Sequence, residues 1–260
     1  MRLSSEARRL VDGFRRRSFL FFSFAILTLA GNVFSAPPVA LNDPVEGQKL
    51  ARELREVKPA ENAEFSGLLR IYSPGANARE VPLRSAIKVG ASDWTWRYDA
   101  RPTNAPEEHL TIRHSSERPS DYEWRRGEQV MKLSGDRATN NFAGSDFAPL
   151  DLGLEFFHWP TQLLVAREMR KGRGCDVLES RPAQASLYSR VVSWVDQESR
   201  QQGQPGLLMA EAYDNQGRLL KEFEITGFKK IEGQYQVSEM EIRNRQTKTR
   251  TRLQFDFDKQ

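Results

Sequence analysis

The fold is decided by the stretch Asn140-Asn-Phe-Ala-Gly-Ser-Asp-Phe-Ala-Pro-Leu-Asp-Leu-Gly-Leu-Glu-Phe-Phe-His-Trp159. Apolar side chains crowd this stretch, but glycines and Pro149 interrupt it, so it cannot follow the strict alternation of a strand. The segments on both sides of it do alternate. The sequence therefore predicts a short, irregular, partly helical plug or lid that lies across one face of a sheet and gives that face something to pack against.

The flanking segments read as short strands joined by turns. We expect strands at 65–71, 81–89, 92–98, 110–112, 122–126, 129–133, 162–169, 175–179, 188–194, 207–213, 219–225, 234–243 and 251–257. We put the count at about ten or eleven antiparallel strands, in a mainly β (α+β) fold. Polar residues occupy one side of successive strands, so a single curved sheet fits better than a sandwich of two covered sheets.

A helix is expected before the first strand. Asp43 can act as the N-cap and Pro44 occupies the first helical position. Val45, Leu50, Leu54 and Val57 follow near helical spacing, and the helix should end before Pro59. Its polar face mixes acidic and basic side chains, which favours packing on its own domain rather than on a membrane surface.

The candidate binding residues are apolar. In Ser92 to Tyr98 the alternation places three aromatic rings on one side of a strand, facing the plug. Together with the plug they give ten candidates for an apolar cavity and its lid: Trp94, Trp96, Tyr98, Phe142, Phe147, Leu150, Leu152, Phe156, Phe157 and Trp159. Gly144 and Gly153 are candidate hinges of the lid. The alternative is that these rings simply fill the interior and bind nothing.

The charge is concentrated at the N-terminus. The chain of 260 residues has a formal net charge of +4, and residues 1–36 carry all of that excess. The remainder is neutral with its charges interspersed, which argues against nucleic acid as a partner. Arg15-Arg16-Arg17 followed by the apolar run from Phe19 to Ala30 predicts a cleavable signal peptide over residues 1–35, with the general or the twin-arginine export route open. An uncleaved anchor is the alternative. Residues 36–260 then form a single domain acting in the periplasm.

Several motifs resemble those of LolA-like outer-membrane lipoprotein-sorting proteins. Gly144-Ser145-Asp146-Phe147 followed by Asp151-Leu152 is similar to the family's Gly-Ser-Asp-Phe-Ser-Tyr-x-Asp-Leu pattern, although Ala148 and Pro149 replace its Ser-Tyr. The resemblance continues through Tyr188 to Asp196, Tyr213 to Arg218 and Met240-Glu241-Ile242. It covers the second half of the chain clearly and the first half only in strand layout.

The resemblance implies an incomplete antiparallel β-barrel, open along one side, in which helices cover an apolar concavity that takes up acyl chains. The expected function is a monomeric periplasmic carrier of lipoproteins or other lipids, without a cofactor. Its partners would be acyl chains, an inner-membrane transporter and an outer-membrane acceptor. The alternative is an envelope sensor or interaction module that binds a protein through an exposed sheet edge.

Enzymatic signals are weak. His109 and His114 are five residues apart on a strand and so face opposite sides, with no partner at metal-ligand spacing. We found no motif for nucleophilic, phosphate-binding or redox chemistry. Cys175 is the only cysteine, and its strand-like surroundings predict a small buried apolar residue. Asp146 is interpreted as a helix N-cap. The sequence therefore predicts no enzyme.

Overall fold

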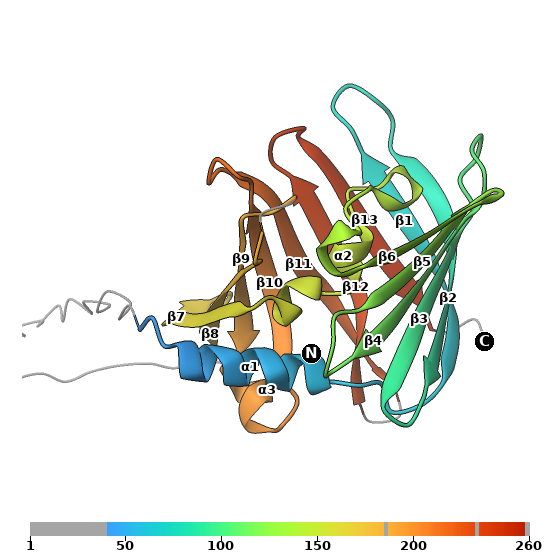
Figure 1. Cartoon of the computed structure of the whole chain (residues 1–260). Coiled ribbons are helices and arrows are strands. Elements are labelled where there is room, and N and C mark those ends of the chain that lie inside the picture. The colour runs from blue at the N-terminus through green and yellow to red at the C-terminus, as the bar shows by residue number, and fades with distance from the viewer. Residues whose placement is uncertain (1–40, 185–186, 232–233, 258–260) are drawn as a thin grey trace, which may run out of the picture. The chain divides into compact units, whose positions relative to one another are not determined.

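One antiparallel sheet of thirteen strands makes up most of this computed structural model, which describes residues 41–184, 187–231 and 234–257 (Figure 1). The strands are β1 Ala63–Tyr72, β2 Arg79–Val89, β3 Asp93–Ala100, β4 Glu108–Ser115, β5 Asp121–Arg126, β6 Gln129–Ser134, β7 Thr161–Arg170, β8 Arg173–Arg181, β9 Arg190–Asp196, β10 Gly206–Tyr213, β11 Leu219–Ile231, β12 Gln234–Asn244 and β13 Thr249–Asp256. The mainly β, single-sheet prediction is confirmed. The count of about ten or eleven was too low, because all thirteen expected segments form separate strands.

The strand order explains where the plug must lie. It runs β6-β5-β4-β3-β2-β1-β13-β12-β11-β10-β9-β8-β7, so the chain forms two meanders that meet where β1 pairs with β13. β6 and β7 are consecutive in sequence but lie at opposite edges of the sheet. The connection between them therefore has to cross a face of the sheet. Figure 1 shows it between the β1–β6 meander and the β7–β13 meander. The sheet does not close, as expected for an incomplete barrel.

The crossing segment, residues 135–160, is the plug and contains only short helical turns. They are η1 Gly135–Arg137, η2 Phe142–Gly144, α2 Pro149–Leu152 and η3 Glu155–His158. Ala143 and Leu154 have positive φ angles of 53° and 49°, and Gly144 has one of 67°. These left-handed residues stop each turn from extending into a longer helix, which gives the irregular element predicted from the sequence.

α1 (Pro44–Glu56) begins as expected. The Asp43 carboxylate accepts hydrogen bonds from the amides of Val45 and Glu46 at 2.9 and 3.0 Å. The buried face differs from the predicted one: Leu50 is buried, but Val45 is 76% exposed. The helix packs on β7 through Gly47, where a Cβ would lie 2.5 Å from the carbonyl oxygen of Gln162. Close backbone approach, rather than apolar spacing, thus sets the orientation of α1.

A half-buried arginine ties α1 to the sheet. Arg200 lies in α3 (Gln197–Gln201), and its side chain is 13% exposed. Its guanidinium contacts Asp176 of β8 at 2.6 Å and Glu53 of α1 at 2.6 Å, and it reaches Glu46 at 3.2 Å. The N-terminal helix is therefore fixed by an ion-pair network, as well as by its apolar face.

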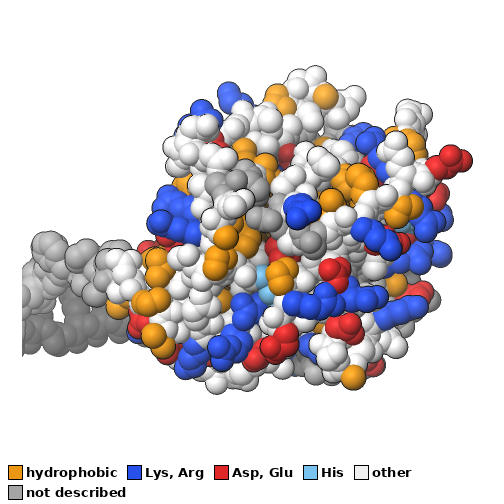
Figure 2. Space-filling view, in the orientation of Figure 1, with side chains coloured by type: hydrophobic (Ala, Val, Ile, Leu, Met, Phe, Trp, Pro, Cys, Tyr) orange, Lys and Arg blue, Asp and Glu red, His pale blue; other side chains and the backbone are white. Residues whose placement is uncertain are grey.

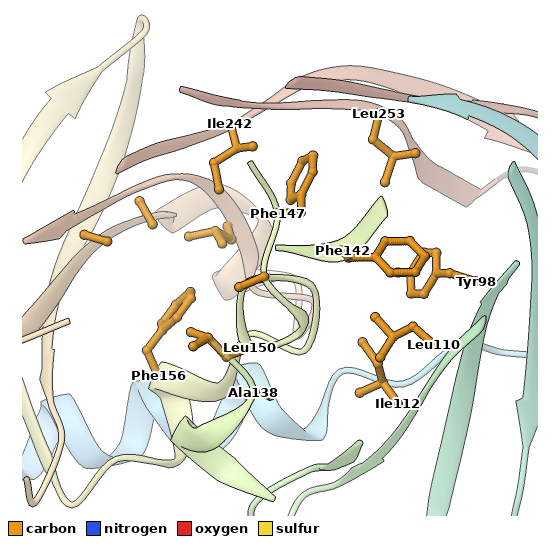
Figure 3. Close-up of a cluster of buried hydrophobic side chains, with 14 of the residues drawn as sticks. Tyr98, Leu110, Ile112, Ala138, Phe142, Phe147, Leu150, Phe156, Ile242 and Leu253 are labelled. Carbon is orange, nitrogen blue, oxygen red and sulfur yellow. The ribbon is translucent and has the colours of Figure 1, made fainter. Parts of the chain in front are cut away.

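The main core lies between the inner face of the sheet and the plug. In Figure 3, Leu150 lies on the plug among Phe147, Phe142 and Phe156, and Tyr98, Ile242 and Leu253 point towards them from the strands. A second, smaller cluster of Cys175, Val177, Trp194 and Met209 packs separately. Cys175 is buried as predicted, and burial raises the pKa of its thiol.

The face of the molecule in Figure 2 carries basic and acidic side chains interspersed with small apolar patches. Among the described residues, no helix is both long and apolar enough to cross a membrane. The predicted signal peptide, 1–35, lies outside the described residues.

Candidate functional site

The ten predicted site residues come together in one apolar cluster. Seven of them are buried: Tyr98, Phe142, Phe147, Leu150, Phe156, Phe157 and Trp159. Trp94, Trp96 and Leu152 are half-buried and pack against the same cluster. The sequence alternation of β3 thus gave the correct face for its three rings.

The rings of β3 lead away from the plug. Tyr98 contacts Phe142 edge-on at a centroid distance of 6.4 Å, and Trp96 stacks on Tyr98 at 5.3 Å. Beyond them is a group that we call the aromatic rim, composed of Phe65, Trp94, Trp96, Phe255 and Phe257. The rim continues the inner face past the plug, and its two tryptophans and Phe257 remain partly exposed.

Two histidines lie near the rim in apolar surroundings. The His114 ring stacks on Trp94 with centroids 3.8 Å apart, and burial lowers its pKa to about 3. Burial, followed by the charge of Arg55, lowers the pKa of His158 to about 4. The buried Nε2 of His114 and Nε1 of Trp96 have no hydrogen-bond partner among the described residues. Both histidines are therefore neutral in this environment at pH 7.

A polar cluster, the plug anchor, fixes the middle of the plug to the sheet. Lys221 of β11 is buried, and its ammonium donates to the Asp146 carbonyl at 2.7 Å and to Asp151 Oδ2 at 2.9 Å. The Tyr188 hydroxyl donates to Asp151 Oδ1 at 2.6 Å. Burial, together with the Asp151 charge, raises the pKa of Tyr188 well above its usual range, so the phenol keeps its proton. Thr251 of β13 bonds both the amide and the carboxylate of Asp146.

Further polar contacts hold the rest of the plug. The Glu155 carboxylate accepts from the Ser120 amide and the Tyr122 hydroxyl at 3.1 and 2.9 Å. Glu108 of β4 accepts from the Ala143 amide at 2.9 Å. Gln162 of β7 donates to the carbonyls of Phe156 and Trp159. Because a backbone without regular structure must find its hydrogen bonds elsewhere, these buried side chains replace the helix or sheet ladder that the plug lacks.

Two arginines hold the plug on either side of the plug anchor. Arg79 of β2 donates to the Gly144 carbonyl at 3.0 Å, and Arg55 of α1 donates to the Phe157 carbonyl at 2.7 Å. Both arginines are reachable from solvent at the margin of the plug, unlike Lys221.

Two sequence interpretations of the plug were wrong or incomplete. Asp146 is not a helix N-cap: α2 begins at Pro149 after Ala148, and Asp146 instead bonds β13. Gly153 has an ordinary φ of −84°, and a Cβ there would lie 2.2 Å from the Tyr122 hydroxyl. Glycine is therefore required at 153 by close packing against β5, whereas only Gly144 occupies a left-handed conformation.

The closed plug leaves little free space. A cavity of about 20 Å³ remains beside the plug anchor, room for about one or two water molecules. Its polar end is formed by Asp151, Tyr188 and Lys221, and its apolar wall by Phe156, Val191, Ala210, Ala212, Phe223 and Ile242. An acyl chain can enter this region only if the plug moves.

Lys221 was not predicted as a site residue, although a signal was present. Phe223 and Ile225 were placed in the alternation of their strand, and Lys221 continues that alternation on the inner face. Glu108 gives the same signal, two residues before the inner-facing Leu110. A charged residue in an inward position of a strand was the feature that could have located the plug anchor.

The described residues contain no group of three or more His, Cys, Asp or Glu side chains arranged to hold a metal ion. His109 lies on the other face of β4 from His114, and its Nδ1 is 2.6 Å from Asp99 Oδ1. The buried carboxylates of the plug region each accept hydrogen bonds from the fold itself.

Solved structures share this fold. A crystal structure of a DUF1329 family protein from Desulfovibrio piger matches with a TM-score of 0.67 and 23% identity, over 83% of this chain and 92% of the other. A domain named for outer-membrane lipoprotein sorting, from Vibrio parahaemolyticus, matches with a TM-score of 0.67 and 20% identity, over 82% and 92%. A LolA superfamily protein from Nitrosomonas europaea matches with a TM-score of 0.58 and 18% identity, over 81% and 91%.

A family model described as "-like: Uncharacterized protein" matches residues 126–258, just over half of the chain, and the chain belongs to that family. No curated protein sequence matches. The resemblance to LolA-like proteins inferred from the sequence is thereby confirmed, and the solved structures establish the shared fold.

Proposed function

We propose that this protein is a periplasmic carrier that binds the acyl chains of lipoproteins or other lipids on the inner face of its sheet. The observation that carries the proposal is the aromatic rim: half-buried tryptophan rings extend the apolar inner face beyond the plug. Burial of each methylene stabilises a bound chain by about 0.8 kcal/mol, so a face of this kind can hold a long chain away from water.

Binding requires the plug to be displaced. The plug is attached by apolar packing and by side-chain hydrogen bonds, and it pairs with none of the described strands. It can therefore move as a unit without unpairing the strands of the sheet. The rim offers the first contact for a chain, and the space under residues 142–159 becomes available as the plug withdraws. The protein then alternates between a closed state and an open, loaded state.

The supporting comparison is the fold shared with a domain named for outer-membrane lipoprotein sorting. By analogy with a sorting role, we place an inner-membrane donor and an outer-membrane acceptor before and after this carrier, and we propose that the monomer acts without a cofactor or catalytic group. Export through the signal peptide at 1–35, followed by a single domain over 36–260, is part of the proposal.

The test is mass spectrometry of lipid extracted from the protein purified from its native envelope, followed by binding of a fluorescent acyl probe. We expect Trp96→Ala to weaken probe binding. The matched control is Trp194→Ala, which removes the same ring from the separate cluster around Cys175. Absence of any co-purified lipid together with no probe binding by the wild-type protein would exclude the carrier function.

A second candidate function follows from the edge of the sheet. β6 has no strand on its outer side, and Val130 on it is 52% exposed. An unpaired edge can bind an extended segment of another protein. If the protein is a sensor or interaction module, Val130→Pro should abolish binding to an envelope partner while acyl-probe binding persists. If it is a carrier, any partner captured should be a transporter or a lipoprotein.

A further inference from the structure

We propose that the ligand of this carrier has an anionic head group, a carboxylate or a phosphate at the end of an acyl chain, and that Lys221 and Tyr188 bind it in place of Asp151. The inference rests on the proposed function, and it specifies the class of lipid. It follows from the loss of both hydrogen-bond acceptors of Lys221 when the plug is displaced from the sheet.

The partners of Lys221 belong to the plug. Among the described residues, its ammonium donates to the Asp146 carbonyl and to Asp151 Oδ2, and both acceptors lie in the segment that must move. Lys221 itself lies on β11 and remains with the sheet. Its side chain is 4% exposed, with the Tyr188 ring 5.7 Å from the ammonium.

Opening therefore separates a buried ion pair. Asp151 leaves with the plug and keeps the Ala148 amide as a partner, while Lys221 stays on the inner wall. A buried charge that loses its counterion is strongly unfavourable. A neutral lipid entering the site would cover the ammonium with apolar groups and supply no anionic acceptor for it. An anionic head group would replace the carboxylate of Asp151.

The donor geometry matches that exchange. Tyr188 and Lys221 bond different oxygens of the same carboxylate, Oδ1 at 2.6 Å and Oδ2 at 2.9 Å. Asp151 thus occupies, in the closed state, a two-donor site for an anion with two oxygens. Charge-assisted hydrogen bonds of this kind are the strong ones, and a carboxylate or phosphate fits them equally.

The adjoining wall accommodates the chain. The small cavity begins at this ion pair and extends along apolar side chains of β9 to β12. Ala210 and Ala212 occupy successive inward positions of β10 where larger side chains would fill the space. A head group at Lys221 therefore directs its chain over the two alanines.

The experiment measures displacement of a neutral naphthylamine probe from the purified full-length protein by oleate, by oleyl alcohol and by oleoyl lysophosphatidate, all below their micellar concentrations. The acid and the alcohol share one chain and differ only in the head group. We expect oleate to bind at least about tenfold more tightly than the alcohol, the difference that a charged hydrogen bond gives. The ratio between oleate and lysophosphatidate identifies the preferred anion.

The decisive variant is Asp151→Asn combined with Lys221→Met, which removes both charges and so avoids an unpaired one. It should bind acid and alcohol with similar affinity, whereas Lys132→Met, an exposed lysine on β6, should keep the preference. Lys221→Arg should retain part of it. Equal binding of acid and alcohol by the wild type, or a preference that survives the double substitution, would overturn the head-group inference while leaving the carrier function intact. If the probe does not bind and no lipid co-purifies with the protein, both fall.

Discussion

Two buried ion pairs on opposite faces of the sheet show how differently the same chemistry is used. Inside, Lys221 is paired with Asp151 of the plug. Outside, Glu241 of β12 is 2% exposed but is surrounded by Arg243, Arg252 and Arg250 at 2.6, 3.2 and 3.7 Å. The outer acid has several partners that reach water, whereas both acceptors of the inner lysine belong to the plug. Displacement of the plug would therefore remove the counterion of Lys221, whereas Glu241 would keep its arginines.

The largest expected effect is on the inner pair. Lys221→Met should lower the free energy of unfolding by about 3–5 kcal/mol, because it leaves Asp151 buried without its cation. Arg243→Met should cost less than about 1 kcal/mol, since the arginine is largely exposed and Glu241 keeps two others. Urea unfolding of both variants measures the contrast. Similar losses would show that the two faces are equivalent.

The next effect concerns the apolar contacts of the plug. Leu150 is fully buried at the centre of the core, and Leu150→Ala should cost about 2–5 kcal/mol through lost burial and the cavity left behind. Val130→Ala on the exposed edge strand should change stability by less than about 0.5 kcal/mol. Thermal denaturation followed by near-ultraviolet circular dichroism would compare them. A small loss at Leu150 would mean that the plug is not part of the core.

A smaller effect is expected where the plug presses on β5. Gly153→Ala places a methyl group against the Tyr122 hydroxyl and should cost about 1–3 kcal/mol through overpacking. Gly206→Ala is the matched control, because the nearest atom to its added Cβ is the Ser199 hydroxyl at 3.2 Å. The double substitution Gly153→Ala with Tyr122→Phe should recover part of the loss. Chemical denaturation of the three variants tests this, and no recovery would place the strain elsewhere.

An effect that is smallest at pH 7, where it vanishes, and appears only on acidification is expected at the aromatic rim. The pKa values of His114 and His158 are lowered to about 3 and about 4 from 6.5, so the unfolded chain takes up protons before the folded one does. Stability should be constant above about pH 6.5 and fall as the pH decreases from there towards 4. Asp99, Asp176 and Asp196 have pKa values lowered from 3.8 and act below this window.

His114→Phe keeps the stacking on Trp94 and removes one titrating group. It should flatten the slope of unfolding free energy against pH between 6.5 and 4, measured by urea unfolding at several pH values. A slope equal to that of the wild type would assign the effect to other groups.

Much of the fold could be read from local patterns. The alternation of Trp94, Trp96 and Tyr98, the N-cap at Asp43 and the irregular stretch around Pro149 each depend on neighbours in sequence, and each was predicted correctly. The interpretation of Asp146 failed because its partners, Thr249 and Thr251, lie about a hundred residues away. The buried face of α1 was misjudged for the same reason, since Gly47 is placed by Gln162.

The sequence by itself determined the strands, the single curved sheet and the apolar segment that covers it, because periodicity and turn residues act over a few positions. Only the tertiary structure decided that β6 and β7 lie at opposite edges, so that the segment between them must cross the sheet. It also decided that Lys221, Tyr188 and Asp151 meet at one point beneath that segment. Long-range contacts of this kind depend on the order of strands in the sheet, and no local pattern encodes that order.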